Sequence, residues 1–330
     1  MTANPNSGDS SSRSPSPARG SVVVPSYNHA PFVEHCLWSI IKQTLQPAKL
    51  VVIDDGSRDA SPRVIERVLK NCPLPSELIV RENRGLCATL NEGLARATGE
   101  YFAYLGSDDL WLPSFLQARI QLLEQRPEAV LAYGHAYFVD EENRIVDCTA
   151  DWADYTDGDA REMLLRQAIA PMSPTVVYRR SVLASQAWRA DAKLEDYDLY
   201  LRLSAVGDFA FDSRVLSAWR RHRANKSRDQ QFMLDEQLKA QRAAAQECGM
   251  KEREIERLQT ATRFRRAEDF LRVGDKATAL KLMIENFAGM KSFGAPARML
   301  GRLLTPVSVM RRRNEATARR AHQRFGSIAV

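Results

Sequence analysis

Four short apolar runs alternate with stretches of helical spacing over the first hundred residues, and this alternation most constrains the fold. The runs are residues 22–24, 50–53, 78–80 and 101–105. Between them, apolar residues recur three or four positions apart, as on the buried face of an amphipathic helix. Strands that alternate with helices pair in parallel through crossover connections. The sequence therefore predicts an α/β fold with a Rossmann-like, mostly parallel sheet and flanking helices.

Polar residues follow three of these four runs directly. The pairs are Tyr27 and Asn28, Asp54 and Asp55, and Asp108 and Asp109. Right-handed crossovers place the loops after parallel strands on one edge of the sheet, and open sheets bind ligands there. Two adjacent carboxylates at a strand end favour a divalent cation and a metal-bound diphosphate. Each pair alone is ordinary turn chemistry, but three pairs on one edge indicate a ligand site.

The chain divides into three regions by composition. Residues 1–19 are rich in Ser, Pro, Asn and Gly and are predicted to form a disordered N-terminal tail. Residues 20–225 carry the alternating pattern, with further strands expected at 129–133 and 136–139, joined by Gly134, and at 209–211 and 215–219. From 226 to 330 only helical spacing remains, which predicts an α-helical C-terminal region.

The net charge is +6, and the excess cations gather near the C-terminus. Six arginines lie between positions 311 and 324, with Glu315 the only acid among them. Such a segment suits peripheral contact with an anionic inner membrane, and a solvated helix face is the ordinary alternative. The helical region also offers a surface for another subunit, and no nucleic-acid partner is expected. Five cysteines without C-x-x-C spacing fit a reducing cytoplasm.

Six short motifs follow one another along the chain, at residues 23–28, 52–59, 83–85, 99–101, 107–109 and 194–196. Each is unspecific alone, but their order resembles the family 2 glycosyltransferases, inverting enzymes with the GT-A fold, of the type that makes bacterial cell-surface polysaccharides. The resemblance covers about residues 20–225. It implies transfer of a hexosyl or N-acetylhexosaminyl group from a nucleotide-diphosphate sugar, usually UDP-linked, to a hydroxyl of a glycan or lipid-linked acceptor.

The resemblance also assigns a metal site. Ser107, Asp108 and Asp109 match the segment that holds Mn²⁺ or Mg²⁺ on the donor diphosphate, with Asp108 as the principal ligand and Asp109 in support. The family often has an acid where this chain has Gly106. His222 matches a histidine that approaches the metal, and imidazole suits Mn²⁺; a lone surface histidine is the alternative. A helix N-cap explains one aspartate but not both.

Donor-binding and catalytic residues follow from the same resemblance. Contacts to the nucleoside or diphosphate are expected from Pro25, Tyr27, Asn28, Asp55, Arg84, Ser107 and Arg221. Tyr27 can stack on a flat base, and the Asp55 carboxylate suits the imide N–H of uracil. Asp196 matches the family's catalytic base, with Glu195 orienting it or the acceptor. The alternative is that these acids only complement a helix dipole.

Three other classes of protein compete with this interpretation. An NAD-binding enzyme needs glycines after the first strand, and residues 25–30 contain none. A sugar nucleotidyltransferase usually has a glycine- and basic-rich loop there, which this chain lacks. A catalytically weak or inactive nucleotide-sugar-binding protein stays open because of Gly106. Binding of UDP with and without Mn²⁺ distinguishes these alternatives.

Overall fold

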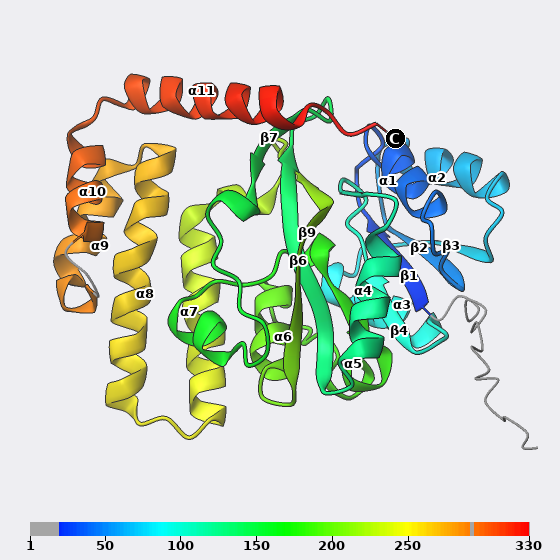
Figure 1. Ribbon diagram of the computed structural model, residues 1–330, viewed down its shortest axis with the longest axis horizontal. Coiled ribbons are helices and arrows are strands. Elements are labelled where there is room, and N and C mark those ends of the chain that lie inside the picture. Colours follow the sequence, from blue (N-terminus) through cyan, green and yellow to red (C-terminus); the bar gives the residue numbers. More distant parts are fainter. Residues whose placement is uncertain (1–19, 291–293, 330) are drawn as a thin grey trace, which may run out of the picture.

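The computed structural model describes residues 20–290 and 294–329, so the predicted disordered tail at 1–19 lies outside the described residues. One nine-stranded sheet has the order β3-β2-β1-β4-β8-β6-β9-β5, with β7 paired to β6. Figure 1 shows this sheet with helices on both faces and a group of helices beyond it. The mixed α/β architecture with a mostly parallel sheet confirms the predicted fold class.

The first half of the sheet follows the predicted alternation. Its strands β1 (Gly20–Ser26), β2 (Lys49–Asp55), β3 (Ser76–Arg81) and β4 (Tyr101–Tyr104) are all parallel. The connecting helices are α1 (Val33–Ile41), α2 (Ser61–Lys70) and α3 (Leu86–Arg96). The carboxyl ends of these strands therefore share one edge, as the sequence predicted.

The second half is mixed in direction. It contains β5 (Leu110–Trp111), β6 (Ala129–Val139), β7 (Ile145–Cys148), β8 (Val177–Arg179) and β9 (Asp208–Arg220). β6 and β9 run parallel, whereas β8 is antiparallel to both of its neighbours, β4 and β6. The helices here are α4 (Phe115–Gln125), α5 (Arg180–Gln186) and α6 (Glu195–Leu203). Shorter helical turns lie at Thr149–Asp151, Glu162–Arg166, Ser173–Thr175, Lys226–Arg228 and Phe287–Gly289.

The predicted breaks inside β6 and β9 are wrong, because each is one continuous strand. Gly134 does not end β6; the register between β6 and β9 shifts there instead. A Cβ atom at this position would collide with the Arg119 guanidinium and the Asp212 carbonyl. The glycine is therefore needed for a close approach within the sheet, and not for a turn.

The C-terminal helices are α7 (Gln230–Glu247), α8 (Glu252–Val273), α9 (Lys276–Glu285), α10 (Gly294–Leu304) and α11 (Val307–Phe325). α11 runs back across the molecule to β7 (Figure 1). The segment after it is held by bonds from Ile145 N to Gly326 O at 3.0 Å and from Ile328 N to Asn143 O at 3.0 Å. No helix within the described ranges is both long enough and apolar enough to cross a bilayer.

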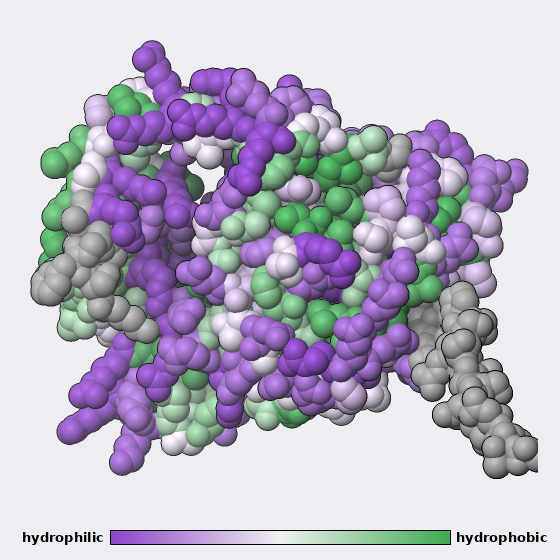
Figure 2. Space-filling model, viewed as in Figure 1, coloured by the Kyte–Doolittle hydropathy of each residue, from purple (hydrophilic) through white to green (hydrophobic). Residues whose placement is uncertain are grey.

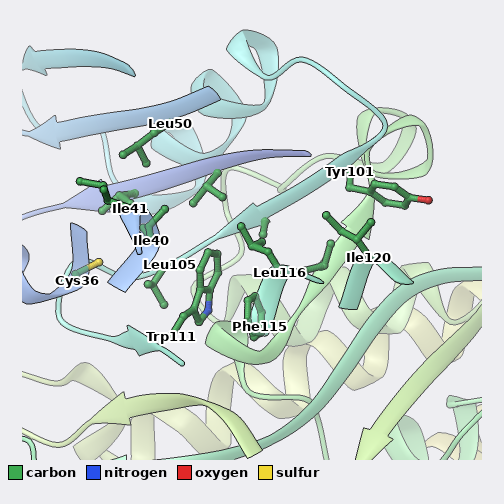
Figure 3. Packing of buried hydrophobic residues seen from close by; sticks show 14 of the residues in the cluster. Cys36, Ile40, Ile41, Leu50, Tyr101, Leu105, Trp111, Phe115, Leu116 and Ile120 are labelled. Atoms are coloured by element: carbon green, nitrogen blue, oxygen red, sulfur yellow. The ribbon is translucent and has the colours of Figure 1, made fainter. Parts of the chain in front are cut away.

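Alternate residues of β1 fill separate cores on the two faces of the sheet. Val22 and Val24 pack with α1 and α4, whereas Val23 packs with α3 and α6. Figure 3 shows the first of these cores, where the rings of Trp111 and Phe115 stack with centroids 4.2 Å apart. Ala240 of α7 belongs to the second core. The helical region is therefore joined to the sheet by a shared core.

Candidate functional site

The loops after β1, β2, β3 and β4 form what we call the loop edge (residues 27–30, 54–59, 82–85 and 106–109). Asn28 joins the first two loops: its N–H donates to Ser57 Oγ at 2.8 Å, and its Oδ1 accepts from Arg58 N at 2.8 Å. Asn28 has φ +56°, in the left-handed region that Asn tolerates. Tyr27 beside it is 45% exposed, so its ring is free to stack on a planar ligand.

Asp55 joins the second and third loops. Its buried carboxylate accepts hydrogen bonds from Arg84 N at 2.9 Å and Gly85 N at 2.8 Å, and it pairs with Arg81. A carboxylate has about four acceptor positions, so little capacity remains for a ligand. Arg84 itself directs an exposed side chain to solvent and its backbone to Asp55. Arg81, which the sequence interpretation did not single out, thus fixes the candidate donor-binding residue Asp55.

Asp108 faces a histidine with each of its carboxylate oxygens. His222 Nε2 lies 2.9 Å from Asp108 Oδ2, and His29 Nδ1 lies 3.7 Å from Asp108 Oδ1. One ligand-type atom from each of the three side chains lies within 4.8 Å of those of the other two. The structure thus brings together Asp108 and His222, which were predicted as ligands. It adds His29, to which the sequence assigned no role.

The charge states of this cluster suit a cation. Burial raises the pKa of Asp108, but the hydrogen bond with His222 and the nearby His29 outweigh it, and the pKa lies below its usual value. Burial lowers the pKa of the His29 imidazole. A carboxylate anion and a neutral imidazole are the forms that bind divalent metals. The residues present therefore fit a divalent cation.

Asp109 lies outside this cluster and has a different environment. Its Oδ1 accepts from Arg220 N at 2.9 Å, and only 4% of the residue is exposed. Burial raises its pKa well above the usual value, and the charge of Asp108 raises it further. An aspartate in this position holds the β9 backbone against the loop edge and is a poor charged ligand.

The sequence interpretation named Arg221 as a candidate and did not name Arg220. Arg220 holds the backbone next to the candidate metal site. Its buried guanidinium donates to Asp108 O at 2.7 Å, Asp140 O at 2.7 Å and Asn143 Oδ1 at 2.6 Å. The Arg221 guanidinium instead lies 3.9 Å from the centroid of the Phe138 ring and pairs with Asp147 at 3.2 Å. Adjacent side chains along an extended segment point to opposite sides. This alternation is the feature of the sequence that could have indicated that only one of the two arginines faces the interior.

Gly106 is closely surrounded by the two carboxylates. A Cβ at this position would lie 2.9 Å from Asp108 Oδ1 and 3.2 Å from Asp109 Oδ2. An acidic side chain here would have to displace both of them. Ser107 is fully buried, and its Oγ lies 2.8 Å from His29 Nδ1. The absence of an acid at 106 therefore matches the way the neighbouring groups pack.

Asp196 lies in the first turn of α6, as predicted. Burial raises its pKa to about 6, although its Oδ1 accepts from Tyr197 N at 2.7 Å. The segment leading to α6 rests on α3, where Cys87 Sγ lies 3.3 Å from Ala192 O and Asn91 bonds both backbone groups of Trp188. Glu195 precedes Asp196 in the same turn. A carboxyl group that titrates near neutrality suits proton transfer.

The sequence profile of glycosyl transferase family 2 matches residues 21–185. An uncharacterized glycosyltransferase of Nostoc sp. is 30% identical over 166 residues, which are 49% of this chain and 51% of that protein. Chondroitin synthase of Escherichia coli is 24% identical over 202 residues, 59% of this chain and 28% of that protein. The chain thus spans about half or less of the length of these relatives.

Two solved structures share the fold. The mannosyltransferase PcManGT from Pyrobaculum calidifontis, in complex with GDP-Man and Mn²⁺, has a TM-score of 0.60 and 19% identity over 92% of this chain and 85% of that one. S. aureus TarS 1–349 in complex with UDP-GlcNAc has a TM-score of 0.58 and 15% identity, covering 82% of this chain and 89% of that one. At these identities the likeness shows the fold alone.

Proposed function

The chain belongs to glycosyl transferase family 2, and on that premise we propose that it is an inverting transferase for a UDP-linked hexose or N-acetylhexosamine. The acceptor we propose is a hydroxyl of a glycan or a lipid-linked glycan in polysaccharide biosynthesis. The observation that carries the proposal is that one fold contains both a candidate metal site and a candidate general base. Asp108 faces two histidines at the loop edge, and Asp196 has a pKa of about 6 in the first turn of α6.

Asp196 acts as the general base in this proposal. With a pKa of about 6 it is mostly ionised at neutral pH and is a stronger base than an ordinary carboxylate. It takes the proton of the acceptor hydroxyl as that oxygen attacks the anomeric carbon. The bond from this carbon to the diphosphate oxygen breaks on the opposite face, so the configuration inverts. Glu195 orients the base or the acceptor.

Asp108 and His222 hold the divalent metal in this proposal, which we take to be Mn²⁺ or Mg²⁺. The metal supplies positive charge that stabilises the leaving diphosphate. Asp109 acts indirectly, because it bonds Arg220 N while the Arg220 side chain holds the carbonyl of Asp108. The mannosyltransferase of similar fold was solved with GDP-Man and Mn²⁺, which supports a metal-bound nucleotide-sugar donor.

The nucleoside is proposed to lie against Pro25, Tyr27 and Asn28, with the exposed Arg84 towards the diphosphate. The predicted contact of Ser107 would be indirect, because this residue is fully buried and its hydroxyl lies against His29. Tyr27 has the exposure needed to stack on a base. Asp55 has one acceptor position left for the uracil imide N–H after its bonds to Arg81, Arg84 and Gly85. Cytosine has no proton at that ring nitrogen, so UDP should bind more tightly than CDP.

Activity on a panel of nucleotide sugars tests the proposal. The wild-type protein should hydrolyse one UDP-sugar slowly in the presence of Mn²⁺ and transfer its sugar to an acceptor glycan. Calorimetry should show UDP binding that strengthens with Mn²⁺. An inactive binding protein would bind UDP and release no sugar. A nucleotidyltransferase would instead release pyrophosphate from UTP and a sugar phosphate. Either result would exclude transfer.

We also propose that the helical region makes a peripheral contact with an anionic membrane at its cytoplasmic face. Large apolar side chains are exposed on α9 and α10, among them Ile284 at 68% and Leu304 at 82%. In Figure 2 apolar atoms lie along the edge formed by these helices, and polar side chains project from α11 above them. Arg311, Arg312 and Arg313 are all exposed at the start of α11. Exposed apolar groups beside arginines are typical of interfacial binding.

Sedimentation of the full chain with vesicles tests this contact. The protein should pellet with phosphatidylglycerol vesicles at low salt and not with phosphatidylcholine vesicles. Leu304→Glu combined with Arg312→Glu should abolish pelleting while activity on a soluble acceptor is retained. A truncated chain is unsuitable, because Ala240 of α7 belongs to the core of the sheet. Equal pelleting of the wild type and the variant would contradict the idea, and self-association on a sizing column would point to a second subunit instead.

A further inference from the structure

The candidate metal site has no acid at position 106, but a histidine from another loop, His29, lies beside Asp108. At position 106 a glycine leaves no side chain, and the space beside it is filled by the carboxylates of Asp108 and Asp109. His29, from the loop after β1, presents Nδ1 to Asp108 Oδ1 at 3.7 Å. His222 reaches the other oxygen of the same carboxylate at 2.9 Å.

These spacings suit donors around one ion. Two donor atoms held about 2.1 Å from a metal at angles of about 90–120° lie about 3.0–3.7 Å apart. The two nitrogen-to-oxygen distances, 2.9 and 3.7 Å, cover that interval. The two distances end on different oxygens of the Asp108 carboxylate, and one ligand atom from each of the three residues lies within 4.8 Å of the other two. One ion can therefore bind both histidines when Asp108 uses both of its oxygens, or when its carboxylate rotates to offer one.

His29 is held in place by hydrogen bonds of its backbone and by contacts of its ring. Its backbone N–H donates to Ser61 Oγ at 2.9 Å. Its backbone carbonyl accepts from Phe32 N and Val33 N at 2.9 Å each. The ring meets the His222 ring edge to face, with centroids 5.4 Å apart. Its Nδ1 contacts Ser107 Oγ at 2.8 Å, so the Ser107 side chain has to change rotamer before that nitrogen can bind a metal. The ring is thus preorganised towards Asp108.

We propose that His29 is a third protein ligand of the donor-bound metal, so that two imidazoles and one carboxylate hold the ion. This inference rests on the proposed function. It gives the site a chemical preference, because imidazole nitrogen suits Mn²⁺, Co²⁺ and Zn²⁺ better than it suits Mg²⁺, which favours oxygen ligands. The chain should therefore prefer Mn²⁺ to Mg²⁺ more strongly than a site with a carboxylate in place of His29.

Pulsed electron paramagnetic resonance of the full chain with Mn²⁺ and UDP counts the nitrogens bound to the metal. The wild-type complex should show coupling to two nitrogens, and His29→Gln should show one. Mn²⁺ affinity in the presence of UDP, followed by calorimetry, should fall about tenfold in this variant. His322→Gln is the matched control, because His322 lies on α11 and bonds Gly326 O; it should keep both nitrogens.

His29→Asp gives a second test in the same position. A carboxylate there should lower the ratio of Mn²⁺ to Mg²⁺ affinity and leave a single nitrogen coupling, while UDP still binds with metal. One nitrogen in the wild type, unchanged in His29→Gln, would overturn the role of His29 and leave the proposed function standing. No Mn²⁺ bound to the wild type with UDP would overturn both the inference and the metal-dependent mechanism.

Discussion

The loop edge and the helical region from α8 to α11 are built in opposite ways. At the loop edge, buried carboxylates accept hydrogen bonds from backbone N–H groups of distant parts of the chain: Asp55 from Arg84 N, and Asp109 from Arg220 N. In the helical region, large apolar side chains remain exposed, including Leu304, Ile284 and Phe287. The difference shows that tertiary contacts fix the carboxylates of one region in place, whereas the other region keeps large apolar side chains in contact with solvent.

The two regions are nevertheless connected through the end of the chain. Ile328 N donates to Asn143 O at 3.0 Å, and Asn143 Oδ1 accepts from the Arg220 guanidinium at 2.6 Å. Arg220 in turn holds the carbonyl of Asp108. The segment after α11 therefore braces the turn that supports the loop edge, and substitutions in each region measure how separable they are.

The largest effect is expected from Asp196→Asn. Loss of the general base should lower kcat by about 10²–10⁴-fold, while the Kd for UDP with Mn²⁺ stays unchanged. Steady-state kinetics and calorimetry measure the two quantities. Asp198→Asn is a control in the same helical turn, because Asp198 pairs with Arg202 at 3.0 Å. A variant at position 196 with near-normal kcat would refute the assignment of the base.

Asp108→Ala should lose both transfer and metal-dependent donor binding. Removing the carboxylate that both histidines face should lower kcat/KM by about 10²–10³-fold and abolish the strengthening of UDP binding by Mn²⁺. Calorimetry with and without Mn²⁺ measures the second effect. Retained metal dependence would place the cation elsewhere.

The titration of Asp196 should appear in both activity and stability. Activity should fall as the pH drops through about 6, because the protonated carboxyl cannot accept the acceptor's proton. The folded pKa of about 6 lies above the ordinary aspartate value of 3.8, so the stability contribution is full below the unfolded pKa and is lost as the pH rises through 6. Asp196→Asn should therefore be more stable than wild type at pH 7, by up to about 3 kcal/mol. Urea unfolding at pH 4 and pH 7 tests the sign.

Arg220→Met and Arg221→Met sharpen the comparison with two adjacent residues. Arg220→Met leaves two buried carbonyls and an amide oxygen without their donor, and should lower the free energy of unfolding by about 3 kcal/mol and weaken Mn²⁺ binding. Arg221 is exposed, so its replacement should change stability by less than about 1 kcal/mol. Urea unfolding compares them, and equal losses would contradict the separate roles given to the two arginines.

The smallest effect on folding stability is expected from Leu304→Glu in the helical region. Because the side chain is 82% exposed, the free energy of unfolding should change by no more than about 0.5 kcal/mol. Vesicle binding should nevertheless weaken. A large loss of stability would show that this side chain is buried against something in the folded protein.

Much of the fold could be predicted from the sequence, because the parallel strands are continuous apolar runs between amphipathic helices. β5 and β7 were missed, since a two-residue strand such as Leu110–Trp111 has no period to detect. The predicted breaks in β6 and β9 were wrong, because Gly134 serves close packing against Arg119 and not a turn. The six motifs singled out Asp108 and Asp196 as candidates, and the family resemblance singled out His222. Arg81, His29 and Arg220 lie in none of these motifs.

By itself the sequence determined which residue types stand at strand ends, because the alternation of apolar runs and helices requires a sheet with its loops on one edge. It determined the presence of Asp108 at that edge and of Asp196 at a helix start. Only the tertiary structure decided that His29 and His222, 193 positions apart by number, face the same carboxylate, and that Arg220 is buried while Arg221 is exposed. The physical reason is that contacts between residues far apart in the sequence depend on strand register and on the packing of distant segments. The local spacing of residue types does not determine either of these.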